Sequence, residues 1–195
     1  MKSTIIYAHP YEKSFNHGIL ETVVKGLTDH HHDIELIDLN AENFNPVMTR
    51  NDLSFFSQGN FADPKVGEYQ KKIENSDHLF FIFPIWWNDA PAILRGFFDK
   101  VFLKNWAYIP KKSGMLQGRL KQIKKATLIM TMGAPEIYYH LAIKSSIAKN
   151  IARAILLTCG IRNVEMIGLC AVDKVNDSKR KKWLAGIEKY IGKLR

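Results

Sequence analysis

The most apolar stretch of the chain predicts a buried strand followed by a loop and a helix. Leu79–Phe83 is a run of apolar residues, which is typical of a central strand that is buried on both faces. Beyond Pro91, apolar residues recur at helical spacing as far as Phe102. Because proline cannot donate to a β-ladder, Pro84 is expected to end the strand, whereas Pro91 suits the first turn of the helix.

The remainder of the chain alternates between strand-like and helix-like patterns. Further strands are expected at Lys2–Ala8, Asp33–Leu39, Ala126–Met132 and Asn163–Cys170. Further helices are expected directly after Asn16, near Asn51–Ser57, and at Lys65–Asn75, Ser146–Cys159 and Asp177–Leu194. This alternation predicts an α/β fold in a single domain over residues 1–195. Its core would be a doubly wound, five-stranded parallel sheet with helices on both faces, joined by right-handed crossovers.

Composition narrows the class of protein. No segment approaches the roughly 18 to 20 uninterrupted apolar residues of a membrane-spanning helix, and the first residues do not resemble a signal peptide. A soluble, cytoplasmic protein without an integral membrane segment is therefore expected. Cys159 and Cys170 lie in apolar contexts without histidine or cysteine partners at metal spacing. They are expected to be buried free thiols, and no metal site is predicted.

The net charge of +9 is unevenly distributed. Residues 1–99 contain 8 Lys/Arg and 14 Asp/Glu, whereas residues 100–195 contain 20 and 5. The basic half would suit a phosphorylated cofactor, a membrane surface or nucleic acid. It carries no nucleic-acid recognition motif and its lysines are scattered, so a mostly solvated face is the default interpretation and nucleic-acid binding is not expected.

Three loops that follow predicted strands carry ligand-binding residue types, and parallel strands would bring them to one edge of the sheet. The first contains His9, Ser14, Phe15 and Asn16. Its helix N-terminus and polar side chains favour a phosphate; the alternative is that Ser14 merely caps the helix. It lacks the glycine-rich fingerprint of a dinucleotide-binding turn.

The other two loops favour a planar ring. The second contains Pro84, Ile85, Trp86 and Trp87, and the third contains Thr131, Met132, Gly133 and Ala134. The tryptophans suit a flat aromatic ligand, although burial in the core is the alternative. A ligand with a phosphate tail and a planar ring, such as flavin mononucleotide, satisfies all three loops.

These motifs, together with Asn43-Phe44-Asn45-Pro46 and the Pro-Ala-Ile-Leu-Arg-Gly start of the helix after Asp89, resemble the flavodoxin-like NAD(P)H:quinone oxidoreductases over nearly the whole chain. The resemblance implies a flavodoxin-like fold, a non-covalent flavin (FMN, or alternatively FAD) and a homodimer with the active site at its interface. It also implies ping-pong, two-electron reduction of quinones or nitroaromatics by NADPH or NADH. Carried over by position, the first loop would hold flavin phosphates. The second would border the isoalloxazine edge, and the third would contact its pyrimidine end.

The chain also departs from the family pattern. Asn88-Asp89 stands where relatives often have an aromatic residue. Tyr139, or Tyr138 if the loop is one residue shorter, matches a catalytic tyrosine of the longer animal enzymes, but the position six residues on is Ser145, and His140 is out of register. The C-terminal extension of the larger relatives is not seen here.

Two other functions compete with quinone reduction. Some family members act as ancillary subunits bound peripherally to potassium-efflux transporters. A one-electron flavodoxin is disfavoured, because those proteins are usually acidic and use a hydroxyl-rich phosphate loop.

Overall fold

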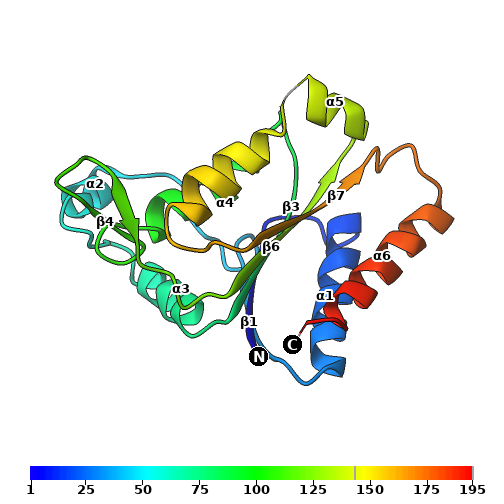
Figure 1. Ribbon diagram of the computed structural model, residues 1–195, viewed down its shortest axis with the longest axis horizontal. Helices are drawn as coiled ribbons and strands as arrows, with labels where there is room; N and C mark the ends of the chain where they lie inside the picture. Colours follow the sequence, from blue (N-terminus) through cyan, green and yellow to red (C-terminus); the bar gives the residue numbers. More distant parts are fainter. Residues whose placement is uncertain (143, 195) are drawn as a thin grey trace.

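The computed structural model describes residues 1–142 and 144–194 and places a five-stranded parallel sheet at the centre of the molecule (Figure 1). Its strands are β1 (Lys2–Tyr7), β2 (Asp33–Asp38), β3 (His78–Pro84), β6 (Lys125–Met132) and β7 (Val164–Cys170). Their order is β2-β1-β3-β6-β7, and each neighbouring pair is parallel. This is the flavodoxin-like order of a doubly wound sheet, so the predicted fold class is confirmed.

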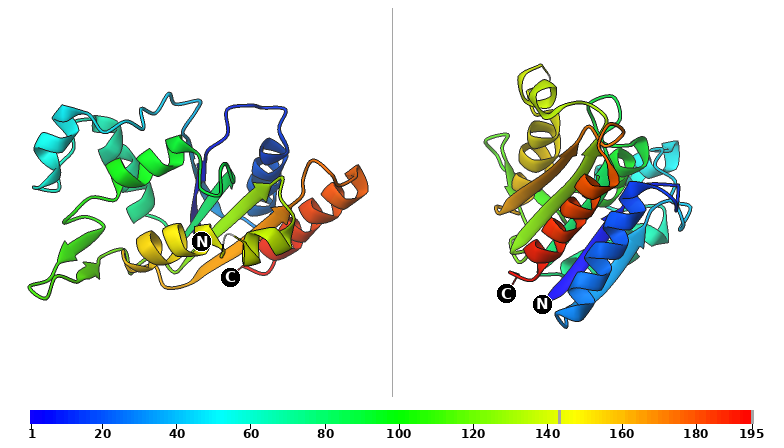
Figure 2. Two further views of the ribbon diagram at one scale, coloured as in Figure 1. Left: turned by 90° about the horizontal axis from the view of Figure 1, so that it is seen from above. Right: turned by 90° about the vertical axis from the view of Figure 1, so that its right-hand side faces the viewer.

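Helices cover both faces of the sheet. Their bounds are α1 (Phe15–Asp29), α2 (Arg50–Phe56), α3 (Pro64–Glu74), α4 (Ala92–Val101), α5 (Glu136–Leu141), the π-helix η1 (Ala148–Leu157) and α6 (Asp177–Ile191). Helices α1 and α6 lie side by side on one face (Figure 2). On the other face, α3, α4 and η1 pack against the sheet. Within the described residues, no helix is long and apolar enough to cross a membrane.

Strand β3 explains why one apolar run organises the fold. All its residues are buried. Phe80 and Ile82 face the core beneath α1 and α6, whereas Leu79, Phe81 and Phe83 face the core beneath α3, α4 and η1. A strand with helices on both faces favours apolar residues at successive positions, and the sequence supplies them from Leu79 to Pro84, after the buried His78 at the amino end.

Three features differ from the sequence-based expectations or add to them. The short helix α5 follows the third loop, where no helix was expected. A small antiparallel hairpin, β4 (Tyr108–Pro110) and β5 (Leu116–Gly118), forms within a stretch expected to be a simple connection. The helix expected from Ser146 is a π-helix over most of its length. Gly160 follows it with φ +104°, a conformation that favours glycine. Cys159 and Cys170 are free thiols, as predicted, but only Cys159 is buried, whereas Cys170 is half-buried.

Candidate functional site

The three predicted loops meet at the carboxyl edge of the sheet. Pro84, the last residue of β3, pairs in register with Thr131 of β6. The Ile85 amide donates to the Thr131 carbonyl over 2.7 Å, and the Ala8 amide donates to the Ile82 carbonyl over 3.0 Å. The ends of β1, β3 and β6 are therefore fixed to one another, and the loops that follow them emerge together.

The first loop presents the N-terminus of α1. Ser14 is its N-cap, and the Ser14 Oγ accepts from the His17 amide at 3.1 Å. The alternative role of Ser14 as a cap is thus observed. Capping leaves the amides of Phe15 and Asn16 in the first turn without intrahelical acceptors, and the helix dipole makes this end attractive to an anion.

Asn16 joins the first loop to the third. Its side chain is only 5% exposed, and its Nδ2 donates to the Thr131 Oγ1 over 2.8 Å. Among the described residues, its Oδ1 is buried without a hydrogen-bond partner. Buried polar atoms are nearly always paired, so this oxygen is available to a hydrogen-bond donor from outside the chain.

His9 is held in one tautomer. Its Nδ1 accepts from the Tyr11 amide at 3.1 Å, which leaves the hydrogen of the neutral ring on Nε2. Burial lowers the pKa of His9 below its usual value. The ring lies 6.1 Å from the Trp86 ring, so the first and second loops are neighbours.

The second loop is a tight turn that exposes both tryptophans. Trp86 and Asp89 exchange two backbone hydrogen bonds, and the residues between them, Trp87 and Asn88, have φ values of +48° and +62°. These are the features of a type I′ turn. Trp86 is 47% exposed and Trp87 is 99% exposed, so the alternative that they belong to the core is wrong.

The third loop presents backbone groups, rather than side chains, to the candidate site. Thr131 and Met132 are buried. The carbonyls of Met132 and Ala134 accept from the amides of Val172 and Ala171, so the chain after β7 supports this loop. A Cβ at Gly133 would lie 2.7 Å from Asp173 Oδ2, which leaves little room for a side chain there.

The two candidate tyrosines lie on α5 in different surroundings. Tyr139 is buried, and burial raises its pKa, with the amides of Ile147 and Ala148 partly opposing the shift. Tyr138 is 46% exposed. The out-of-register His140 hydrogen-bonds through Nδ1 to Ser145 Oγ over 2.8 Å. The structure therefore brings His140 into contact with Ser145, the residue at the position where the longer enzymes have their histidine.

Some neighbours of the site escaped sequence reasoning. Asp173 lies beside Gly133, and Lys179 lies over the Trp183 ring at 5.7 Å. Trp183 in turn lies 6.1 Å from the Phe15 ring, which brings a cation to the α1 side of the site. The spacing of Lys179 and Trp183 by one helical turn is visible in the sequence and predicts their contact. The contact of Trp183 with Phe15 is not visible there, because it depends on the packing of α6 on α1.

Comparison with known proteins connects this geometry to a family. Residues 1–193 match the flavodoxin-like fold family. The NAD(P)H dehydrogenase (quinone) 1 of Cavia porcellus is 32% identical over 160 residues, covering 72% of this chain. The match spans 56% of that relative's length.

Solved structures match over a larger share of this chain. The NAD(P)H:quinone oxidoreductase from Methanothermobacter marburgensis is 29% identical with a TM-score of 0.90, covering 100% of this chain and 99% of that one. General stress protein 14 from Treponema denticola, solved in complex with FMN, is 25% identical with a TM-score of 0.64. That match covers 98% of this chain and 97% of the other.

Proposed function

The chain belongs to the flavodoxin-like fold family, and from this premise we propose that it is a flavin-dependent NAD(P)H oxidoreductase. Its substrates would be quinones or related electrophiles such as nitroaromatics, reduced by two electrons in a ping-pong sequence. The observation that carries the proposal is the hydrogen bond between Asn16 and Thr131. It connects the N-terminus of α1, where a phosphate would bind, to the end of β6, and among the described residues it leaves the buried Asn16 Oδ1 without a partner.

The donor set fits a flavin. The amides of Phe15 and Asn16, the Ser14 hydroxyl and the His9 Nε2–H would hold its phosphate, since all four are at the α1 end of the site. Pro84, Ile85, Trp86 and Trp87 would border the ring edge. Thr131, Met132, Gly133 and Ala134 would face its pyrimidine end, where Gly133 allows close approach.

When bound, a flavin supplies the hydride-accepting and hydride-donating chemistry, and the chain supplies orientation and electrostatics. Backbone amides of the third loop would stabilise negative charge at the pyrimidine end. Tyr139, or the more exposed Tyr138, is proposed to handle the accompanying proton. Basic residues of the second half of the chain would favour NADPH, although either nicotinamide cofactor fits the proposal.

FMN is the preferred cofactor and FAD the alternative. FMN is present in the Treponema denticola relative, and the single phosphate of FMN is enough to occupy the proposed phosphate site at α1. Lys179, which lies over the Trp183 ring beside Phe15, is proposed as the cation for a second phosphate, so direct competition between FMN and FAD tests the choice of flavin.

Flavin retention with matched cap variants tests the site. The purified protein is incubated with FMN or FAD, the excess is removed, and the visible spectrum is recorded. Ser14→Ala removes a helix cap at the proposed site, whereas Thr49→Ala removes the equivalent cap of α2 away from it. Both should cost about 1 kcal/mol of stability.

The proposal expects Ser14→Ala to weaken flavin binding and Thr49→Ala to leave it unchanged. Equal affinities in the two variants, or no flavin retained by the wild type, would contradict the site. Rapid menadione-dependent oxidation of NAD(P)H with parallel-line kinetics then tests the reaction. Flavin binding without turnover would instead favour an ancillary role.

A further inference from the structure

Four sulfur-bearing side chains gather around Gly168 near one edge of the sheet. Strand β6 pairs with the edge strand β7 so that Met130 lies opposite Gly168 and Met132 lies opposite Cys170. Met166 precedes Gly168 by two residues on β7 and therefore shares the face of Cys170. Of the chain's six methionines and two cysteines, four side chains thus border one glycine.

A cavity of about 120 Å³, which we call the sulfur cavity, lies between these strands and α5. Its lining residues are Met130, Met132, Glu136, Tyr139, His140, Met166, Gly168 and Cys170. A Cβ at Gly168 would lie 3.8 Å from the Met132 methyl carbon, so the Met132 side chain folds over the glycine. Protein interiors contain few voids larger than a water molecule, so four sulfur-bearing side chains around an open space are not explained by core packing alone.

The side chains at this cavity suit a soft metal ion. In the described part of the chain, no three His, Cys, Asp or Glu side chains gather in a way that could hold a metal ion, and these are the residues that build Zn(II) sites. His140 lines the cavity, but it hydrogen-bonds to Ser145 through Nδ1 and faces Glu136 through Nε2 at 3.6 Å. The groups that remain are three thioethers and one thiol, the soft ligands that favour Cu(I).

The sulfur cavity has both an entry from solvent and a buried interior. On the edge strand β7, Met166 is 37% exposed and Cys170 is half-buried. On β6, Met130 and Met132 are buried. An ion can therefore reach the cavity from the β7 side and be enclosed on the β6 side. Methionine has three rotatable bonds and a polarizable sulfur, so these side chains can turn their sulfur atoms toward an ion without movement of the strands.

From this arrangement we propose that the sulfur cavity binds one Cu(I) ion, with Cys170 as a thiolate ligand and the thioethers of Met130, Met132 and Met166 as the others. On binding, the Cys170 thiol loses its proton to solvent and the copper keeps its oxidation state. The site goes beyond the proposed function. Met132 contributes its side chain here, whereas its proposed contact with a flavin is through the backbone.

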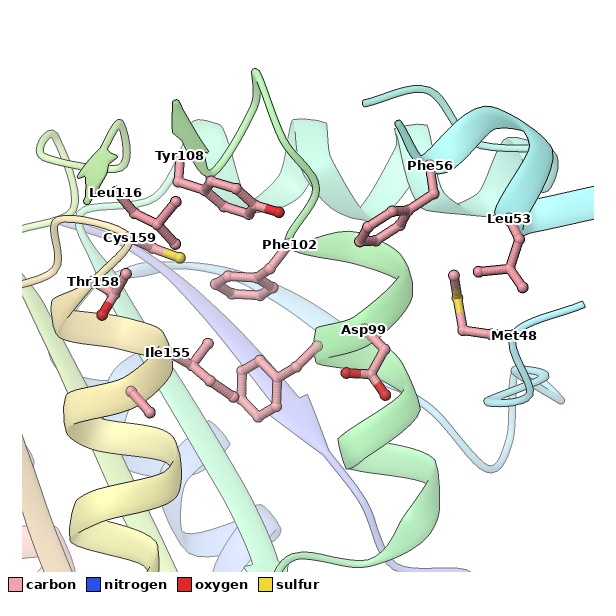
Figure 3. A pocket seen from close by; sticks show the side chains of 12 residues that line it. Met48, Leu53, Phe56, Asp99, Phe102, Tyr108, Leu116, Ile155, Thr158 and Cys159 are labelled. Atoms are coloured by element: carbon pink, nitrogen blue, oxygen red, sulfur yellow. The ribbon is translucent and has the colours of Figure 1, made fainter. Parts of the chain in front are cut away.

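The other cysteine provides a matched control. Cys159 and Met48 both line a larger cavity of about 350 Å³ beside α4 and η1, but they lie on opposite sides of it (Figure 3). The remaining side chains around that cavity contain no sulfur. One thiol and one distant thioether do not form a metal site, so substitutions of Cys159 and Met48 remove the same types of atom without touching the sulfur cavity.

Competition for Cu(I) with a chromophoric chelator, without oxygen and without added flavin, tests the site. The wild-type chain, free of any affinity tag, should take up one equivalent of Cu(I). Cys170→Ser and Met166→Leu each remove one sulfur with little change of volume. Because even the loss of a group behind the ligands costs about 10- to 100-fold in metal affinity, each variant should bind Cu(I) at least about 10-fold more weakly. Cys159→Val and Met48→Leu should bind as wild type does.

The methyl signals of the methionines locate the ion. In protein isotope-labelled at the methionine methyl groups, one equivalent of Cu(I) should shift the NMR signals of Met130, Met132 and Met166 and leave that of Met48 in place. Unshifted signals from β6 and β7, wild-type affinity in Cys170→Ser, or equal uptake of Zn(II) would overturn the inference. Because these measurements contain no flavin or substrate, failure of the copper site and failure of the proposed reductase activity are separate outcomes.

Discussion

His78 lies in the interior at the amino end of β3, and its burial makes the stability of the protein depend on pH. Its side chain is 1% exposed, stacks on Phe80 with ring centroids 4.1 Å apart, and hydrogen-bonds through Nε2 to Thr127 Oγ1 over 2.7 Å. Burial lowers the pKa of His78 from 6.5 to about 3, with Lys125 contributing in the same direction. The folded protein therefore holds a neutral imidazole.

The direction of this pH dependence follows from the protonation of His78 in the folded and the unfolded state. In the unfolded chain the imidazole binds a proton below pH 6.5, whereas in the folded chain it does so only near pH 3. Between these values the unfolded state binds more protons, so stability falls as pH falls. The loss is about 1.4 kcal/mol per pH unit, or roughly 3 kcal/mol at pH 4.5, and is absent above pH 7.

Urea unfolding of wild type and His78→Gln at pH 7, 5.5 and 4.5 measures this contribution. Glutamine retains a hydrogen-bonding group for Thr127 but does not titrate, so its free energy of unfolding should depend on pH by about one proton less than that of wild type. His31→Asn, in an exposed turn at φ +56°, removes an imidazole without touching the core and should behave as wild type. Parallel pH profiles for wild type and His78→Gln would refute the reasoning.

Four further perturbations have defined outcomes in the same unfolding assay. Gly96→Ala should lose more than about 2 kcal/mol of stability despite alanine's helix propensity, because its Cβ would overlap Pro46 in the loop between β2 and α2. Gly18→Ala, with open space around it in α1, should instead gain about 0.5 to 1 kcal/mol. Lys100→Met should cost about 3 to 5 kcal/mol by stranding the buried carboxylate of Asp52, and adding Asp52→Leu should recover part of it. Thr131→Val should cost about 1 to 3 kcal/mol and weaken flavin retention, whereas unchanged retention would remove the third loop from the site.

The elements that sequence reasoning found were those with long, regular patterns. The apolar run of β3 and the helical spacing of α4 identified the central strand and the helix after it, and the alternation of elements then fixed the sheet. The hairpin β4/β5 was missed because three-residue strands with exposed or half-exposed residues carry no periodic signal. Its pairing depends on contacts between residues rather than on local preference.

The candidate site was likewise predictable only in part. Loops that follow buried strands were predictable, because topology alone brings them to one edge. The Asn16–Thr131 hydrogen bond joins residues far apart in the chain, and the full exposure of Trp87 depends on a left-handed turn that its sequence does not favour. The pairing of His140 with Ser145 likewise depends on backbone conformation, since Lys144 and Ser145 both have positive φ.

Anaerobic addition of NADPH to the flavin-loaded protein, followed by menadione, tests the central claim most directly. If the carboxyl-edge site orients a flavin for hydride transfer, the visible absorbance should bleach with one equivalent of NADPH and return with one equivalent of menadione. A flavin that remains oxidised with both NADPH and NADH, although it is tightly bound, would contradict the assignment of this site to NAD(P)H-dependent reduction.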